Sequence, residues 1–234
     1  MGMQLARLVE TSAALVATPA RNAKIGLVAQ LLTDAGPEDV ALVAAYLSNV
    51  VPQRRLGVGW RSLSALPEPA TEATLTIRDV DAAFEVLAAA AGAGSTSVRR
   101  TELAHLLSRA TAPEQEYLRG LMLGGVRQGA QDGVMLAAIA KAAGVPLAAV
   151  QRAVMLAGYA APVAEAALAG GTDALERIGL EVLRPLRPML AGSAPEVIDS
   201  FEERDNSDSG TGDEFAGFCC RHLIESSFFC QYQD

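Results

Sequence analysis

The stretch GAGSTSVRRTELAHLLSRATAPEQEYLRGLMLGGVRQGAQDGVMLAAIAKAAGV, residues 92–145, decides the fold. Its apolar side chains recur at the spacing of an α-helix that buries one face. Its glycines and prolines mark helix ends, and they predict helices over 97–109, 113–123 and 134–143. This part of the chain is therefore expected to consist of short helices packed against one another.

The same pattern continues on both sides of this stretch. Apolar stripes predict two helices near the N-terminus, one around 5–15 and one around 25–32, and a third helix begins after Pro37. Further helices are expected over 79–91, 147–156 and 163–168, and no strand is indicated before residue 180. We therefore predict an all-α, two-lobed, multi-helix domain over 1–180.

Composition places the protein in a broad class. The hydrophobic content is 50%, but aromatic residues make up only 5%, so the core is expected to use small aliphatic side chains. No apolar run is long enough to span a membrane, and the N-terminus lacks the pattern of a signal peptide. These features favour a cytoplasmic protein without a membrane partner.

The chain changes character near residue 200. Residues 201–234 hold eight acidic residues but only two basic residues, and they hold five of the six phenylalanines of the chain. They show neither helical nor strand periodicity, so we expect a disordered, acidic tail of non-native origin, such as a frameshifted end. Between the domain and this tail, 181–200 reads as a linker that contains Pro-Met-Leu-Ala at 188–191.

The tail also holds all three cysteines of the chain. A metal site is one interpretation of the tail's thiols and its histidine, but their spacing does not match a CxxC knuckle, so we expect no metal. The residues concerned are Cys219, Cys220, His222 and Cys230.

A weak internal repeat relates the two halves of the domain. Tyr46-Leu47 corresponds to Tyr117-Leu118, and the Arg-x-Gly at 55–57 corresponds to the Arg-x-Gly at 127–129 with an offset of one residue. Each copy reads as a helix, a basic turn containing glycine, and another helix. This pseudo-repeat predicts that two similar turns lie on one face of the domain.

Three turns share a chemistry suited to phosphate groups. They lie at 54–59, 92–100 and 127–133, and each combines glycine with arginine close to a helix start. Free backbone amides at a helix N-terminus attract phosphate, glycine allows close approach, and arginine adds charge. Each turn could instead merely end or cap a helix, with Ser95 or Ser97 as a cap, but three together favour a row of contacts to a duplex backbone.

Trp60, the only tryptophan, has two interpretations. An indole beside arginines can stack on a sugar or base. Because large aromatic side chains are usually buried, we expect Trp60 to pack in the core instead.

Three segments carry a resemblance to a known family: PQRRLGVGWRSL at 52–63, the stretch at 92–145, and RPLRPMLA at 184–191. Through them the chain resembles the N-terminal DNA-binding domain of ATP-dependent DNA ligases of the actinobacterial type. The resemblance covers about 3–195. It implies a monomeric, nucleoid-associated module that grips nicked double-stranded DNA without sequence preference, in a family that serves DNA repair, replication and recombination. Ala93 is a departure, since relatives often carry lysine there. By matching position, the DNA contacts implied are Arg54, Arg55, Gly57, Gly59, Gly94, Ser95, Arg99, Arg127, Gly129 and Gln131.

The resemblance also implies a limit on catalysis. Full-length members use ATP and Mg²⁺, and a lysine soon after the Pro-Met-Leu-Ala segment attacks the ATP phosphate. No lysine follows Lys141 in this chain. We therefore expect no catalytic residue and no cofactor within this chain, and no nick sealing by the chain alone.

Two other functions remain open. Residues 135–158 could form a helix-turn-helix of a transcriptional regulator, although only Gln151 and Arg152 would be available to read bases. Alternatively, the domain could be a helical scaffold that binds protein, with its arginines simply solvated.

Overall fold

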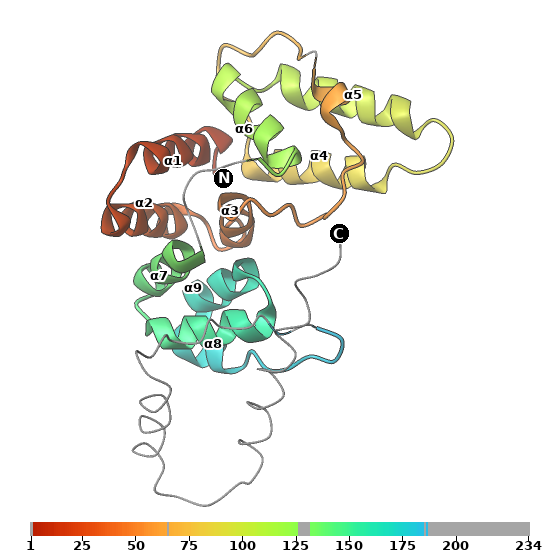
Figure 1. The fold of residues 1–234 in the computed structure, drawn as a ribbon. Coiled ribbons are helices and arrows are strands. Elements are labelled where there is room, and N and C mark those ends of the chain that lie inside the picture. Colours follow the sequence, from red (N-terminus) through yellow and green to blue (C-terminus); the bar gives the residue numbers. More distant parts are fainter. Residues whose placement is uncertain (1, 65, 126–131, 185, 187–234) are drawn as a thin grey trace, which may run out of the picture. The chain divides into compact units, whose positions relative to one another are not determined.

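The computed structural model describes residues 2–64, 66–125, 132–184 and 186, and all regular structure within them is helical (Figure 1). The predicted all-α class is therefore confirmed. Several predictions lie outside these residues: the Pro-Met-Leu-Ala segment at 188–191 and everything predicted for 201–234, including the cysteines and His222. The elements are α1 (Leu5–Ala17), α2 (Arg21–Asp34), α3 (Val40–Leu47), the 3₁₀ helix η1 (Trp60–Leu63), α4 (Ile77–Ala89), α5 (Ser95–Ser108), α6 (Ala112–Met122), α7 (Asp132–Ala143), α8 (Leu147–Ala157) and α9 (Ala160–Glu176).

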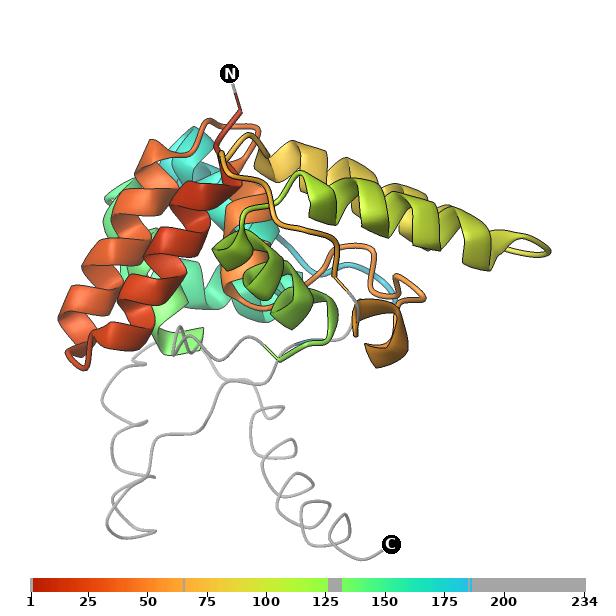
Figure 2. The same ribbon diagram turned by 90° about the horizontal axis from the view of Figure 1, so that it is seen from above.

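The helices pack in two groups within one compact unit. In the first group α7 lies against α2, and α9 contacts α3, α7 and α8 (Figure 1). In the second, α4 and α5 form a hairpin that reaches away from α1 and α2 (Figure 2). α1 and α3 join the groups, because α1 contacts α6 and α3 contacts α4.

Small aliphatic side chains build the core, as the composition predicts. Ala44, Ala138 and Ala164 are fully buried where their helices meet, which lets the backbones approach closely. Phe84, the one phenylalanine before residue 201, is also fully buried and packs edge-on against Tyr46, with ring centroids 6.1 Å apart. In the part of the chain that the structure describes, no helix is long and apolar enough to cross a membrane.

Side chains set the starts of two helices. Thr76 and Asp79 form a capping box at the start of α4, and Thr111 and Glu114 form another at α6. Hydrogen bonds from the backbone N–H and hydroxyl of Thr76 lower the pKa of Asp79, despite the opposing effect of burial. These caps place both helices within two residues of their predicted starts.

An N-terminal strap ties the first residues to α3 and α4. The Leu5 N–H donates to the Leu75 carbonyl at 2.8 Å, and the Met3 N–H donates to Asp39 Oδ2 at 2.7 Å. Arg78 Nε donates to the other Asp39 oxygen at 2.7 Å. Burial alone would raise the pKa of Asp39, but these two donors outweigh it and hold the pKa below its ordinary value.

The pseudo-repeat has a structural basis in its tyrosines and leucines. All four side chains of the two Tyr-Leu pairs are buried, and the Tyr117 hydroxyl donates to the Tyr46 carbonyl at 3.0 Å. The copies differ in the helix that follows the turn. After the first turn comes only the four-residue 3₁₀ helix η1. The second helix predicted for that copy is therefore present, but only as a short 3₁₀ helix.

Candidate nucleic-acid interface

The turn between α3 and η1 is held by a glutamine. Gln53 Nε2 donates to Asp81 Oδ1 at 2.8 Å and to Glu85 Oε1 at 2.7 Å, which fixes the turn on α4. Arg54 and Arg55 follow directly and are both exposed. The acids below the turn are therefore engaged by an amide, and the two guanidinium groups face solvent.

Gly57 and Arg99 come from different predicted turns, and the fold brings them together. Gly57 has a φ of +64°, and a Cβ built on it would lie 2.6 Å from Arg99 Nε. Arg99 Nε donates to the Leu87 carbonyl at 3.2 Å, and its Nη2 donates to the Ala90 carbonyl. A cation at the carbonyl end of α4 also suits the helix dipole. Arg99 thus joins the end of α4 to the Gly57 turn, and its contact with DNA stays a prediction.

The second turn starts α5 without a side-chain cap. Gly94 is the N-cap residue with a φ of +86°, and its carbonyl accepts from the Ser97 and Val98 N–H groups. The interpretation of Ser95 or Ser97 as the cap was therefore wrong. The helix begins at Ser95 because the left-handed backbone of Gly94 turns the chain into it. No atom lies within 4 Å of a Cβ on Gly94 or Gly59, so both turns offer open backbone.

A basic cleft lies between the Gly57 turn and α5. Its volume is about 440 Å³, and its polar walls include Arg61, Ser62, Arg99 and Arg100. Arg61 and Arg100 are exposed. Among the ion pairs of the described residues, none involves Arg54, Arg55, Arg61 or Arg100. This surface, which we call the basic cleft, therefore carries uncompensated positive charge from two segments far apart in sequence.

Trp60 does not pack in the core, and that prediction was wrong. Its side chain is 65% exposed at the start of η1, with Arg119 Cζ 5.9 Å from the ring centroid. Leu63, not Trp60, anchors η1 in the core. The sequence held a signal for this: Trp60 lies among glycines and arginines, without the apolar periodicity of a buried helix.

The third predicted turn lies largely outside the described residues, including Arg127, Gly129 and Gln131. Its borders are described. Gly124 has a φ of +69°, and the Gly125 N–H donates to the Gly120 carbonyl at 2.8 Å, which ends α6 in a Schellman motif. At the other border, the Gly133 carbonyl accepts from Arg21 of α2 at 3.4 Å. Gly124 and Gly125 thus end α6 independently of any ligand.

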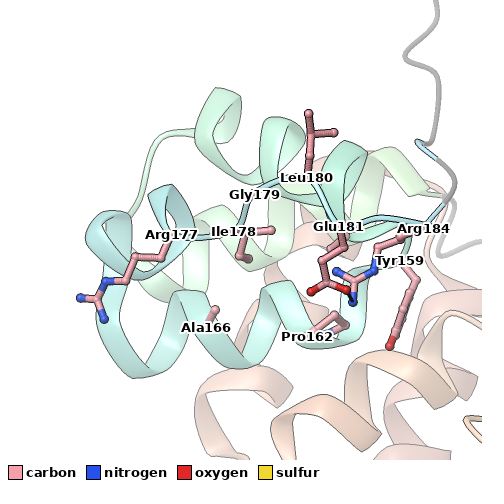
Figure 3. A pocket seen from close by; sticks show the side chains of 10 residues that line it. Tyr159, Pro162, Ala166, Arg177, Ile178, Gly179, Leu180, Glu181 and Arg184 are labelled. Carbon is pink, nitrogen blue, oxygen red and sulfur yellow. Dashed lines mark ion pairs between the residues drawn. The ribbon is translucent and has the colours of Figure 1, made fainter.

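A second hollow lies beside α9 (Figure 3), with a volume of about 480 Å³. Its wall includes Tyr159 and Arg184, but Arg184 pairs with Glu181, and the Arg177 side chain extends away from the hollow. This hollow therefore presents less free positive charge than the basic cleft.

The candidate helix-turn-helix is packed against the rest of the domain. Both α7 and α8 contact α9, and Gln151 on α8 is half-buried. Arg152 lies 3.5 Å from the Ile178 carbonyl. Gln151 is thus partly covered whereas Arg152 is exposed, and two such side chains are fewer than direct readout of bases needs. The described residues also contain no group of histidine, cysteine and acidic side chains that could hold a metal ion.

Comparison with known proteins gives one consistent family. Residues 58–140 match the family model described as DNA ligase N terminus. The chain is 50% identical to a probable DNA ligase of Streptomyces griseus over 201 residues. This aligned region covers 86% of this chain and 39% of that protein. It is 48% identical to a probable DNA ligase of Nocardioides sp. over 198 residues, and this aligned region covers 82% of this chain and 39% of that protein. The chain thus spans about two fifths of the length of these relatives.

Proposed function

Because this chain carries a DNA ligase N-terminal region, we propose that residues 1–180 bind nicked double-stranded DNA without sequence preference. The basic cleft is the observation that supports the proposal most. Arg61 and Arg100 line it, and neither has an acidic partner among the described residues. Arg54 and Arg55, in the turn that contributes Gly57 to the cleft, are exposed and have no ion pair there either. Such groups suit phosphate oxygens, which carry no sequence information.

The mode of contact follows from two kinds of residue in the cleft and in the two turns that contribute to it. Arg54, Arg55 and Arg100 supply charge from flexible, exposed side chains. Gly59 and Gly94 supply backbone that a sugar–phosphate chain can approach without meeting a side chain. We propose that Arg127, Gly129 and Gln131 form a further contact of the same type, in line with the resemblance of their turn to the family.

The proposal is tested by the binding of labelled plain, nicked and gapped duplexes of unrelated sequence, measured by fluorescence anisotropy over a salt series. Arg100→Ala should weaken binding to every sequence alike and reduce the salt slope by about 1, as expected for a lost phosphate contact. Arg177→Ala removes an exposed arginine at the end of α9 and serves as the matched control. A loss confined to one sequence would indicate a regulator, and binding to no duplex would indicate a protein scaffold.

The proposal gives this chain a binding role without nucleotidyl transfer. Its only lysines are Lys24 and Lys141, which lie in α2 and α7. We propose that the purified chain forms no covalent adduct with labelled ATP in the presence of Mg²⁺, and a labelled band would contradict this. We also propose that the chain is a monomer, which size-exclusion chromatography can check. In the cell it would act on nucleoid DNA in repair, replication and recombination, and fluorescence microscopy can check its location on the nucleoid.

A further inference from the structure

Trp60 is an exposed aromatic ring on a firmly held support. The 3₁₀ helix η1 is fixed by Leu63, which is 2% exposed, and the turn before it is fixed by Leu56, which is 6% exposed. The Ser62 N–H donates to the Gly59 carbonyl at 2.9 Å, which closes the short helix. The ring therefore stays at the surface although burial of an indole is favourable.

One positive group lies over this ring, and others lie in the neighbouring basic cleft. Arg119 of α6 holds its guanidinium carbon 5.9 Å from the ring centroid. Arg61 follows Trp60 directly and lines the basic cleft, with Arg100 of α5 on the same cleft. An aromatic ring flanked by arginines is the combination with which proteins hold unpaired nucleotides: the ring stacks on a base, and the cations hold the phosphates.

We propose that Trp60 is a stacking platform for one unpaired DNA base at an interruption of the duplex, such as a one-nucleotide gap or flap. In paired DNA both faces of a base are covered by its neighbours, so an indole can stack only on a base that has left the helix or lacks a partner. The inference rests on the proposed DNA binding and adds a preference among interrupted duplexes.

The sequence provides a direct probe, because Trp60 is the only tryptophan in the chain. Intrinsic tryptophan fluorescence therefore reports this site alone. We expect stronger quenching by duplexes with a one-nucleotide gap or flap than by a nicked duplex of the same sequence. Equal quenching by all of these duplexes, or no quenching by any, would overturn the proposal.

Affinity measurements give an independent test. Trp60→Ala should weaken binding to the gapped and flapped duplexes about ten-fold, since base–aromatic stacking contributes on this scale, and should change binding to the nicked duplex less than about two-fold. Trp60→Phe should restore most of the loss. Tyr159→Ala, which removes another half-exposed aromatic ring, is the matched control and should change neither. Circular dichroism confirms that the variants are folded.

The outcomes separate the two proposals. If the wild-type chain binds nicked and gapped duplexes but Trp60→Ala weakens both equally, the stacking platform is wrong and the DNA-binding function stands. If the wild-type chain binds no duplex, both are wrong.

Discussion

Replacing Gly57 with alanine tests whether the Gly57 turn and Arg99 form one structural unit. The φ of +64° costs a residue with a Cβ about 1–2 kcal/mol. The new Cβ would lie 2.6–2.9 Å from three guanidinium atoms of Arg99, so that side chain must move. We expect the move to break one of the two hydrogen bonds that Arg99 donates to the Leu87 and Ala90 carbonyls, which costs about 1.5 kcal/mol at a half-exposed site. We expect Gly57→Ala to lower the free energy of unfolding by about 3 kcal/mol.

Urea unfolding followed by circular dichroism measures this loss, and two other glycines isolate its parts. Gly92 has a φ of +74° with open space around it, so Gly92→Ala should show the backbone strain alone. Gly59→Ala has neither strain nor contact and should change stability by less than about 0.5 kcal/mol. In an Arg99→Ala background, Gly57→Ala should cost no more than Gly92→Ala does. If Gly57→Ala already matches Gly92→Ala in the wild-type chain, the coupling does not exist.

Three further predictions concern the fold. Tyr117→Phe removes the donor to the Tyr46 carbonyl and should lower the free energy of unfolding by about 1 kcal/mol, measured by thermal unfolding; an unchanged midpoint would contradict it. Thr76→Ala should cost about 1 kcal/mol by removing the cap of α4, and Thr76→Ser should retain most of it. The pKa of Asp79 is lowered from 3.8, so its stabilisation is present above that pH and is lost as the pH falls through the lowered value. The stability difference between wild type and Asp79→Ala should therefore be largest near neutral pH and shrink towards pH 3, as urea unfolding at each pH would show.

Most of the fold could be predicted because helical periodicity is a local property. The capping boxes at Thr76 and Thr111 mark their helix starts within a few residues of sequence. The end of α9 could not be predicted in this way. Its helical segment runs to Glu176 across a non-helical residue, Gly171, where local signals indicate a stop. Packing of α9 against α3, α7 and α8 supplies what the local sequence lacks.

The candidate site was predictable in composition but not in arrangement. Glycines beside arginines indicate phosphate chemistry at Gly57 and again at Gly94. That Arg99 would lie under Gly57 and bind carbonyls of α4 depends on how the α4–α5 hairpin folds back, which no local pattern specifies. The exposure of Trp60 was missed for a related reason. An average preference for burial was applied to a residue whose neighbours already favoured a surface turn.

The packing of α7 on α2 has a consequence for fragments of this chain. The family match at 58–140 includes most of α7 but none of α2 or α9, the helices that cover its apolar face. Met135, Ala138 and Ile139 would then be left in water. A protein produced from those residues alone would be aggregation-prone, because its longest-range contacts are missing. We therefore expect the segment matched by the family model to be too short to fold on its own.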